Sequence, residues 1–83
     1  MPSRVFIIQA EWDPEAECWV ARSSDVPGLA TGADTLEDLV DKLKIIVPEL
    51  LEENGILPVV DDGFDLPFTV MAQRLERVRA GTA

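Results

Sequence analysis

Carboxylates are the most abundant side chains of this sequence that could take part in chemistry. The sequence has no histidine, the usual general base for a serine or cysteine nucleophile. The 83 residues include 16 acidic residues but no histidine and no tyrosine. Without histidine, neither a Ser–His or Cys–His nucleophilic scheme nor the usual zinc sites can be assembled. Cys18 is the only cysteine, and we expect it to be an ordinary buried residue of a strand. The sequence therefore predicts no catalytic residue and no enzyme.

A divalent cation is the remaining ligand that so many carboxylates could bind. The densest acidic group is Asp61-Asp62-x-x-Asp65. It lacks the full ligand spacing of a calcium loop, so a solvated turn is the better interpretation. The sequence also has no glycine-rich phosphate loop and no basic-aromatic patch for bases. We expect no metal ion and no cofactor.

Length and composition predict one domain over residues 1–83. A chain this short buries a modest fraction of its surface, so its core stabilises it only marginally and association with a second copy would help. The hydrophobic share of 47% excludes a disordered chain, despite a net charge of −9. We see no signal peptide and no apolar run near the ~20 residues that span a bilayer, so we expect a cytoplasmic protein.

The charge is unevenly distributed along the sequence. Residues 1–65 hold 15 acidic and four basic residues, whereas residues 66–83 hold Glu76 against Arg74, Arg77 and Arg79. The acidic part should repel phosphate backbones, so we expect no direct binding of nucleic acid. Two interpretations remain open for the acids: they keep a small domain soluble, or they form a face for a basic partner. The three arginines are either solvated or reach an acidic surface of a second subunit.

Alternation of apolar residues predicts strands, and turn residues separate them. The first strand, residues 4–12, places Phe6, Ile8, Ala10 and Trp12 on one face and is joined by a turn at residues 13–16 to a second. Pro27-Gly28 ends the pairing of the second strand. The remaining predicted strands cover residues 18–23, 29–31 and 64–75, the last of them at a sheet edge because of Pro67.

A capped amphipathic helix follows the third predicted strand. Thr35 is the expected N-cap, with Asp38 three residues later as in a capping box. An unbroken apolar stripe then predicts the buried face. Its members are Leu36, Leu39, Val40, Leu43, Ile46, Val47, Leu50 and Leu51. Pro48 lies in phase with this stripe, which predicts one kinked helix rather than two, and Gly55 follows Asn54 as a C-cap signal.

The order of these motifs resembles the HicB-like antitoxin family. A strand hairpin, a D-x-P-G corner and G-x-D-T-x-E-D at the start of a helix carry the resemblance, which covers roughly residues 4–75. The matching residues are Trp19, Asp25, Pro27, Gly28, Gly32, Asp34, Thr35, Glu37 and Asp38. The resemblance implies an α+β fold of partial RNase H type. We expect βββαβ, a mostly antiparallel four-stranded sheet with one long helix on one face, and frayed residues 76–83.

The same resemblance implies a non-enzymatic protein that binds and neutralises a small, basic, RNA-cleaving toxin. Glu11 and Asp13 near one strand end are too few and too peripheral to be the converging carboxylates of an RNase H-type nuclease. Many family members carry a DNA-binding module after this domain, whereas this sequence ends at Ala83. The alternative is a stand-alone self-associating module without a toxin partner.

Two surfaces are expected to bind partners. One helix cannot cover both faces of a four-stranded sheet, so Val5, Ile7, Trp19 and Met71 should face away from the helix or lie near its margin, which predicts a homodimer or larger assembly. Trp19 is either an interface anchor or a cap on the core. The expected contacts with a basic partner lie off the apolar stripe of the helix, and they are Glu37, Asp38, Asp41, Glu49, Glu52 and Glu53.

Overall fold

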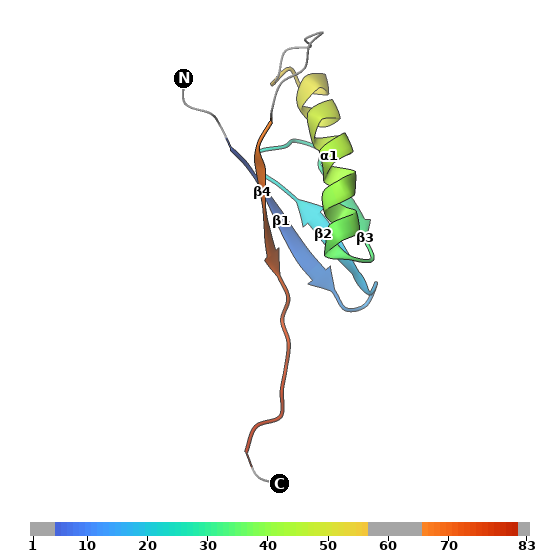
Figure 1. Ribbon diagram of the computed structural model, residues 1–83, viewed down its shortest axis with the longest axis vertical. Coiled ribbons are helices and arrows are strands. Elements are labelled where there is room, and N and C mark those ends of the chain that lie inside the picture. The colour runs from blue at the N-terminus through green and yellow to red at the C-terminus, as the bar shows by residue number, and fades with distance from the viewer. Residues whose placement is uncertain (1–4, 57–65, 82–83) are drawn as a thin grey trace.

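The computed structural model describes residues 5–56 and 66–81 and has the α+β fold that the sequence predicts. Its elements follow the expected order βββαβ (Figure 1). They are β1 (Phe6–Asp13), β2 (Cys18–Arg22), β3 (Thr31–Ala33), α1 (Leu36–Glu53) and β4 (Phe68–Gln73). The sheet order is β3-β2-β1-β4. The β1–β2 and β2–β3 pairs are antiparallel, whereas β1 and β4 are parallel, so the sheet is mixed.

The hydrophobic core lies between α1 and one face of the sheet. From the sheet it takes Phe6, Ile8 and Ala10, which alternate with exposed neighbours along β1. From the helix it takes one side chain in every four, namely Leu39, Leu43, Val47 and Leu51. These four are fully buried, and each contributes about 1.5–3 kcal/mol by leaving water. The apolar stripe therefore predicted the buried helical face correctly.

The helix begins and ends where the sequence predicts. The Thr35 hydroxyl accepts a hydrogen bond from the backbone N–H of Asp38 (3.1 Å), as expected of an N-cap. At the other end Asn54 is the C-cap, and Gly55 adopts φ 71°. The N–H groups of Gly55 and Ile56 bond to the carbonyls of Glu52 and Leu51. This is a Schellman motif, and it satisfies the last carbonyls of the helix.

Pro48 lies inside one continuous helix, as expected. The bend at this position stays a prediction. The Pro27-Gly28 corner also has a local cause, because Gly28 adopts φ 83°, a left-handed conformation that side chains disfavour. The Asn54 side chain donates to the carbonyls of Pro27 (3.3 Å) and Leu50 (2.7 Å) and thereby joins this corner to the end of α1.

The third strand lies two residues later than the sequence predicts. The prediction placed it at residues 29–31, but Leu29 is a buried core residue in the loop and the strand covers Thr31–Ala33. Gly32 is in the strand instead of leading into the helix. It pairs with Val20, and a Cβ at this position would lie 3.0 Å from the backbone oxygen of Trp19. Glycine permits this close approach between β2 and β3.

The last strand is shorter than predicted. It runs from Phe68 to Gln73, and Arg74 and Leu75 lie beyond it. Pro67 precedes the strand, and its carbonyl accepts a hydrogen bond from the N–H of Phe6 (3.3 Å). β4 forms one edge of the sheet, as predicted. The start of the predicted strand, the loop before it and the Asp61-Asp62-x-x-Asp65 group lie wholly or largely outside the described residues.

Candidate functional site: the outer face of the helix

The side of α1 that faces away from the sheet carries a group of exposed carboxylates. The sequence placed six acidic side chains off the apolar stripe, and the structure exposes every one of them. They are Glu37, Asp38, Asp41, Glu49, Glu52 and Glu53. Steps of three or four residues make neighbours on a helical surface, so these acids form two groups, one toward each end of α1, on the same side of the helix. We call this side of α1 the acidic face.

Ile45 lies in the middle of the acidic face. It follows Asp41 by four residues and precedes Glu49 by four, and 65% of its side chain is exposed. An exposed isoleucine framed by charged side chains has the layout of a binding surface, in which an apolar centre is surrounded by a polar rim. Ile45 is not among the residues that the sequence predicted to bind a partner. The available signal was an apolar residue out of phase with the buried stripe.

The two lysines of α1 compensate only part of its six acidic side chains, and the exposed Lys44 lies three residues after Asp41. Lys42 is turned toward β3, where its ammonium group donates to the carbonyl of Gly32 (2.6 Å). The ion pair between Arg74 and Glu76, at 2.8 Å, lies beyond β4 and not on the helix. The face therefore presents a negative potential to an approaching protein.

Helix stability accounts for only part of these acids. Glu37 and Asp38 lie in the first turn, where negative charge is favoured by the helix dipole. Glu52 and Glu53 lie in the last turn, which has no basic residue. Negative charge there opposes the dipole and costs roughly 0.3–1 kcal/mol per residue. The acids at the end of α1 thus reduce helix stability, so their role is not to stabilise the helix but either to keep the domain soluble or to bind a partner.

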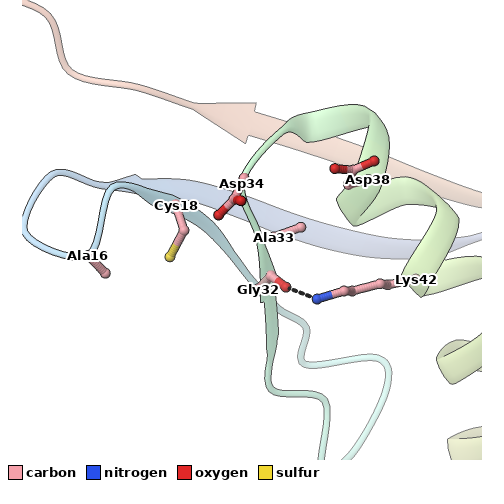
Figure 2. A pocket seen from close by; sticks show the side chains of 7 residues that line it. All are labelled: Ala16, Cys18, Gly32, Ala33, Asp34, Asp38 and Lys42. Atoms are coloured by element: carbon pink, nitrogen blue, oxygen red, sulfur yellow. Dashed lines mark hydrogen bonds between the residues drawn. The ribbon is translucent and has the colours of Figure 1, made fainter.

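A hollow of about 590 Å³ opens beside the acidic face, between the start of α1 and β3. Figure 2 shows its lining, which includes Cys18, Asp34, Asp38 and Lys42. The charged groups of the lining are the carboxylates of Asp34 and Asp38 and the ammonium group of Lys42, which bonds to the Gly32 carbonyl, so the hollow has a net negative charge. The cation best matched to two carboxylates in a wide hollow is an arginine or lysine side chain. Cys18 is half-buried here rather than fully buried.

The described residues hold no group of three or more histidine, cysteine or acidic side chains placed to bind a metal ion. Glu11 and Asp13 lie at the end of β1, as predicted, with no third carboxylate beside them in such a group. Within the described part of the chain, no helix is long and apolar enough to cross a membrane.

Trp19 does not lie on the open face of the sheet. It pairs with Trp12 across β1 and β2, and the two rings meet edge to face with centroids 5.6 Å apart. Residues paired in register share a face, so both indoles lie on the side that α1 covers. Trp19 is half-buried against the core, at its margin. Of its two interpretations, the cap on the core agrees with this position.

The other face of the sheet is open, as the sequence analysis expected. Val5, Ile7 and Met71 are exposed there, with Met71 at 56%. They share the face with polar side chains, among them Gln9, Glu11 and Arg22. This open face is separate from the acidic face, since α1 and the core lie between them.

Comparison with known proteins places the chain in a family. Residues 5–80 match the family described as "Domain of unknown function (DUF1902)". A UPF0150 protein of Thermotoga maritima is 36% identical over 52 residues, which are 63% of this chain and 69% of the relative. The crystal structure of hypothetical protein TTHA1013 from the extremely thermophilic bacterium Thermus thermophilus is similar, with a TM-score of 0.67 and 48% identity. That comparison covers 90% of this chain and 97% of the other. Since the family match spans nearly the whole sequence, this chain belongs to the DUF1902 family.

Proposed function

We propose that this protein is a HicB-like, antitoxin-type binding protein without enzymatic activity, whose acidic face captures and neutralises a small basic RNA-cleaving protein. The observation that carries the proposal is the layout of this face, with Ile45 exposed among carboxylates on both sides. Electrostatic complementarity speeds encounter, and a desolvated apolar centre slows dissociation. The face offers both.

The neighbouring hollow supports the same proposal. A basic partner that covers the acidic face would bring cationic side chains over the first turn of α1, where Asp34 and Asp38 line the hollow. One arginine held by two carboxylates gives charge-assisted hydrogen bonds and a fixed orientation. An enzyme that cleaves RNA needs basic residues to bind phosphates, so covering those residues would block its substrate site. Such a pair of proteins would act in the cytoplasm, where RNA is available.

A second candidate is a self-associating module without a toxin partner. The exposed Ile7 and Met71 on the open face favour it, because contiguous exposed apolar surface marks interfaces. The two candidates differ in which surface is used and in what is bound. One experiment separates them.

The experiment is capture by the tagged full-length chain from the cells in which it occurs, followed by an RNA-cleavage assay of the captured protein. We expect a basic protein of fewer than roughly 100 residues that cleaves RNA when separated and stops when the chain is added back in equal amount. Recovery of the chain alone, in a form that excludes other proteins, would favour the self-associating module. A captured protein whose RNA cleavage is indifferent to added chain would refute neutralisation.

A further inference from the structure

The residues after β4 form an extended arm that little in a single chain holds in place. The arm (residues 74–81) leaves the sheet in line with β4 and projects away from the body (Figure 1). Within the described residues, no backbone hydrogen bond joins it to the rest of the molecule. The radius of gyration is 16.1 Å, whereas a compact chain of this length would have about 12 Å.

An isolated arm of this kind has no reason to stay extended. Ordering each backbone residue costs about 1–2 kcal/mol, and the arm makes few contacts that offset this cost. Its apolar side chains are also fully available, since Leu75 is 79% and Val78 is 89% exposed. A surface on another molecule that packs against these side chains would offset the cost, whereas without one the arm should fray, as the sequence predicts for residues 76–83.

We propose that this surface is the β4 edge of a second copy of the chain, and that two copies exchange their arms. β4 is an edge strand, so among the described residues its outer backbone groups face no neighbouring strand. In each copy, β4 and the arm form one continuous extended strand. A twofold axis near Arg74 sets the extended strands of the two copies side by side and antiparallel. The arm of each copy then lies beside β4 of the other and extends its sheet.

The side chains of the arm suit that position on both faces of the sheet. Arg74 stacks over Trp12, with its guanidinium carbon 4.2 Å from the ring centroid, so even-numbered arm residues continue the face that α1 covers. Val78 falls on that face, where β4 offers the half-buried Val70. Leu75 falls on the open face, opposite Gln73 and diagonal to the exposed Met71 of β4. Because the twofold axis is perpendicular to the sheet, the covered faces of the two copies lie on one side of the shared sheet and the open faces on the other.

The arm exchange uses residues separate from the acidic face, so either proposal can fail without the other. The test compares the full chain with the variant Leu75→Glu/Val78→Glu by light scattering at micromolar concentration. We expect a dimer mass for the unaltered chain and about half that mass for the variant, since the change removes two apolar contacts and places a carboxylate beside the apolar Val70. The control is Ile45→Glu, an equally simple change of an exposed apolar residue on α1, and it should keep the dimer mass.

Hydrogen–deuterium exchange adds a second measurement that locates the contact. In the unaltered chain, alternate amides of residues 75–80, those turned toward β4 of the second copy, should exchange at least about tenfold more slowly than in the double variant, because pairing protects them. Both changed side chains are exposed in a single copy, so circular dichroism should show the same fold. A monomer mass for the unaltered chain, a dimer mass for the double variant, or unprotected arm amides in the dimer would each overturn the proposal.

Discussion

Reversing the charges on either side of Ile45 is expected to slow capture of the basic partner by about tenfold. In the variant Asp41→Lys/Glu49→Lys, two cations replace the carboxylates that flank the apolar centre of the acidic face. Favourable charge raises association rates by one to several orders of magnitude, and like charges at the same place remove that gain. The measurement is the association rate constant, at physiological salt, for the basic protein recovered by capture.

The control changes the same total charge at another place. Glu11→Lys/Glu76→Lys alters two exposed residues, one on the open face of the sheet and one in the arm, and should change the rate by less than about threefold, because charges beyond the Debye length of ~8 Å are screened. Both variants should fold normally, since exposed single charges contribute little to stability. Equal rates for the two variants would mean that only net charge matters and that the acidic face has no specific role.

Replacing Asp25 by alanine is expected to lower the free energy of unfolding by about 1.5–3 kcal/mol, the value of a hydrogen bond to a charged group. The register Gln9↔Arg22 would next pair Ile7 with Ser24, but β2 ends at Arg22. The Asp25 carboxylate instead accepts a hydrogen bond from the N–H of Ile7 (2.8 Å), and the Ser23 hydroxyl donates one to the carbonyl of Ile7. These two side chains continue the hydrogen bonding of β1 after the strand has ended.

The matched control for Asp25→Ala is Ser24→Ala, at the exposed position between the two bonding side chains. It should change the free energy of unfolding by no more than about 0.5 kcal/mol, as is usual for surface positions. Urea denaturation followed by circular dichroism measures both variants. A loss below about 0.5 kcal/mol for Asp25→Ala would show that the D-x-P-G corner is held by its backbone geometry alone.

The sequence predicted the helix well because its signals are local. Apolar spacing, the hydroxyl of Thr35 and the Asn54-Gly55 pair each act within a few residues, and the structure confirms all three. The third strand was placed too early because Leu29 is apolar and Gly32 resembles a break. Leu29 is buried from a loop, and Gly32 is required by the close approach of Trp19. Both causes are tertiary contacts, which a local pattern does not contain.

The candidate site was predicted in part. All six acids of the helix are exposed, as their phase relative to the buried stripe implied. Ile45 was not predicted as a site residue, because the helical periodicity selects the apolar residues of the buried stripe and Ile45 lies on the opposite side of the helix. The faces of the sheet were harder to assign, since they depend on register. The Trp12–Trp19 pairing placed Trp19 beside the core, and the parallel pairing of β4 with β1 could not be derived from strand patterns.

Isoleucine methyl NMR tests most directly whether a basic partner binds the acidic face around Ile45. Ile45 and Ile7 are exposed isoleucines on opposite sides of the molecule, at 65% and 44%. When the captured basic protein is added to chain labelled at isoleucine methyl groups, the Ile45 signal should shift and the Ile7 signal should stay. A shift of Ile7 with an unchanged Ile45 signal would contradict the account and would place the partner on the open face of the sheet.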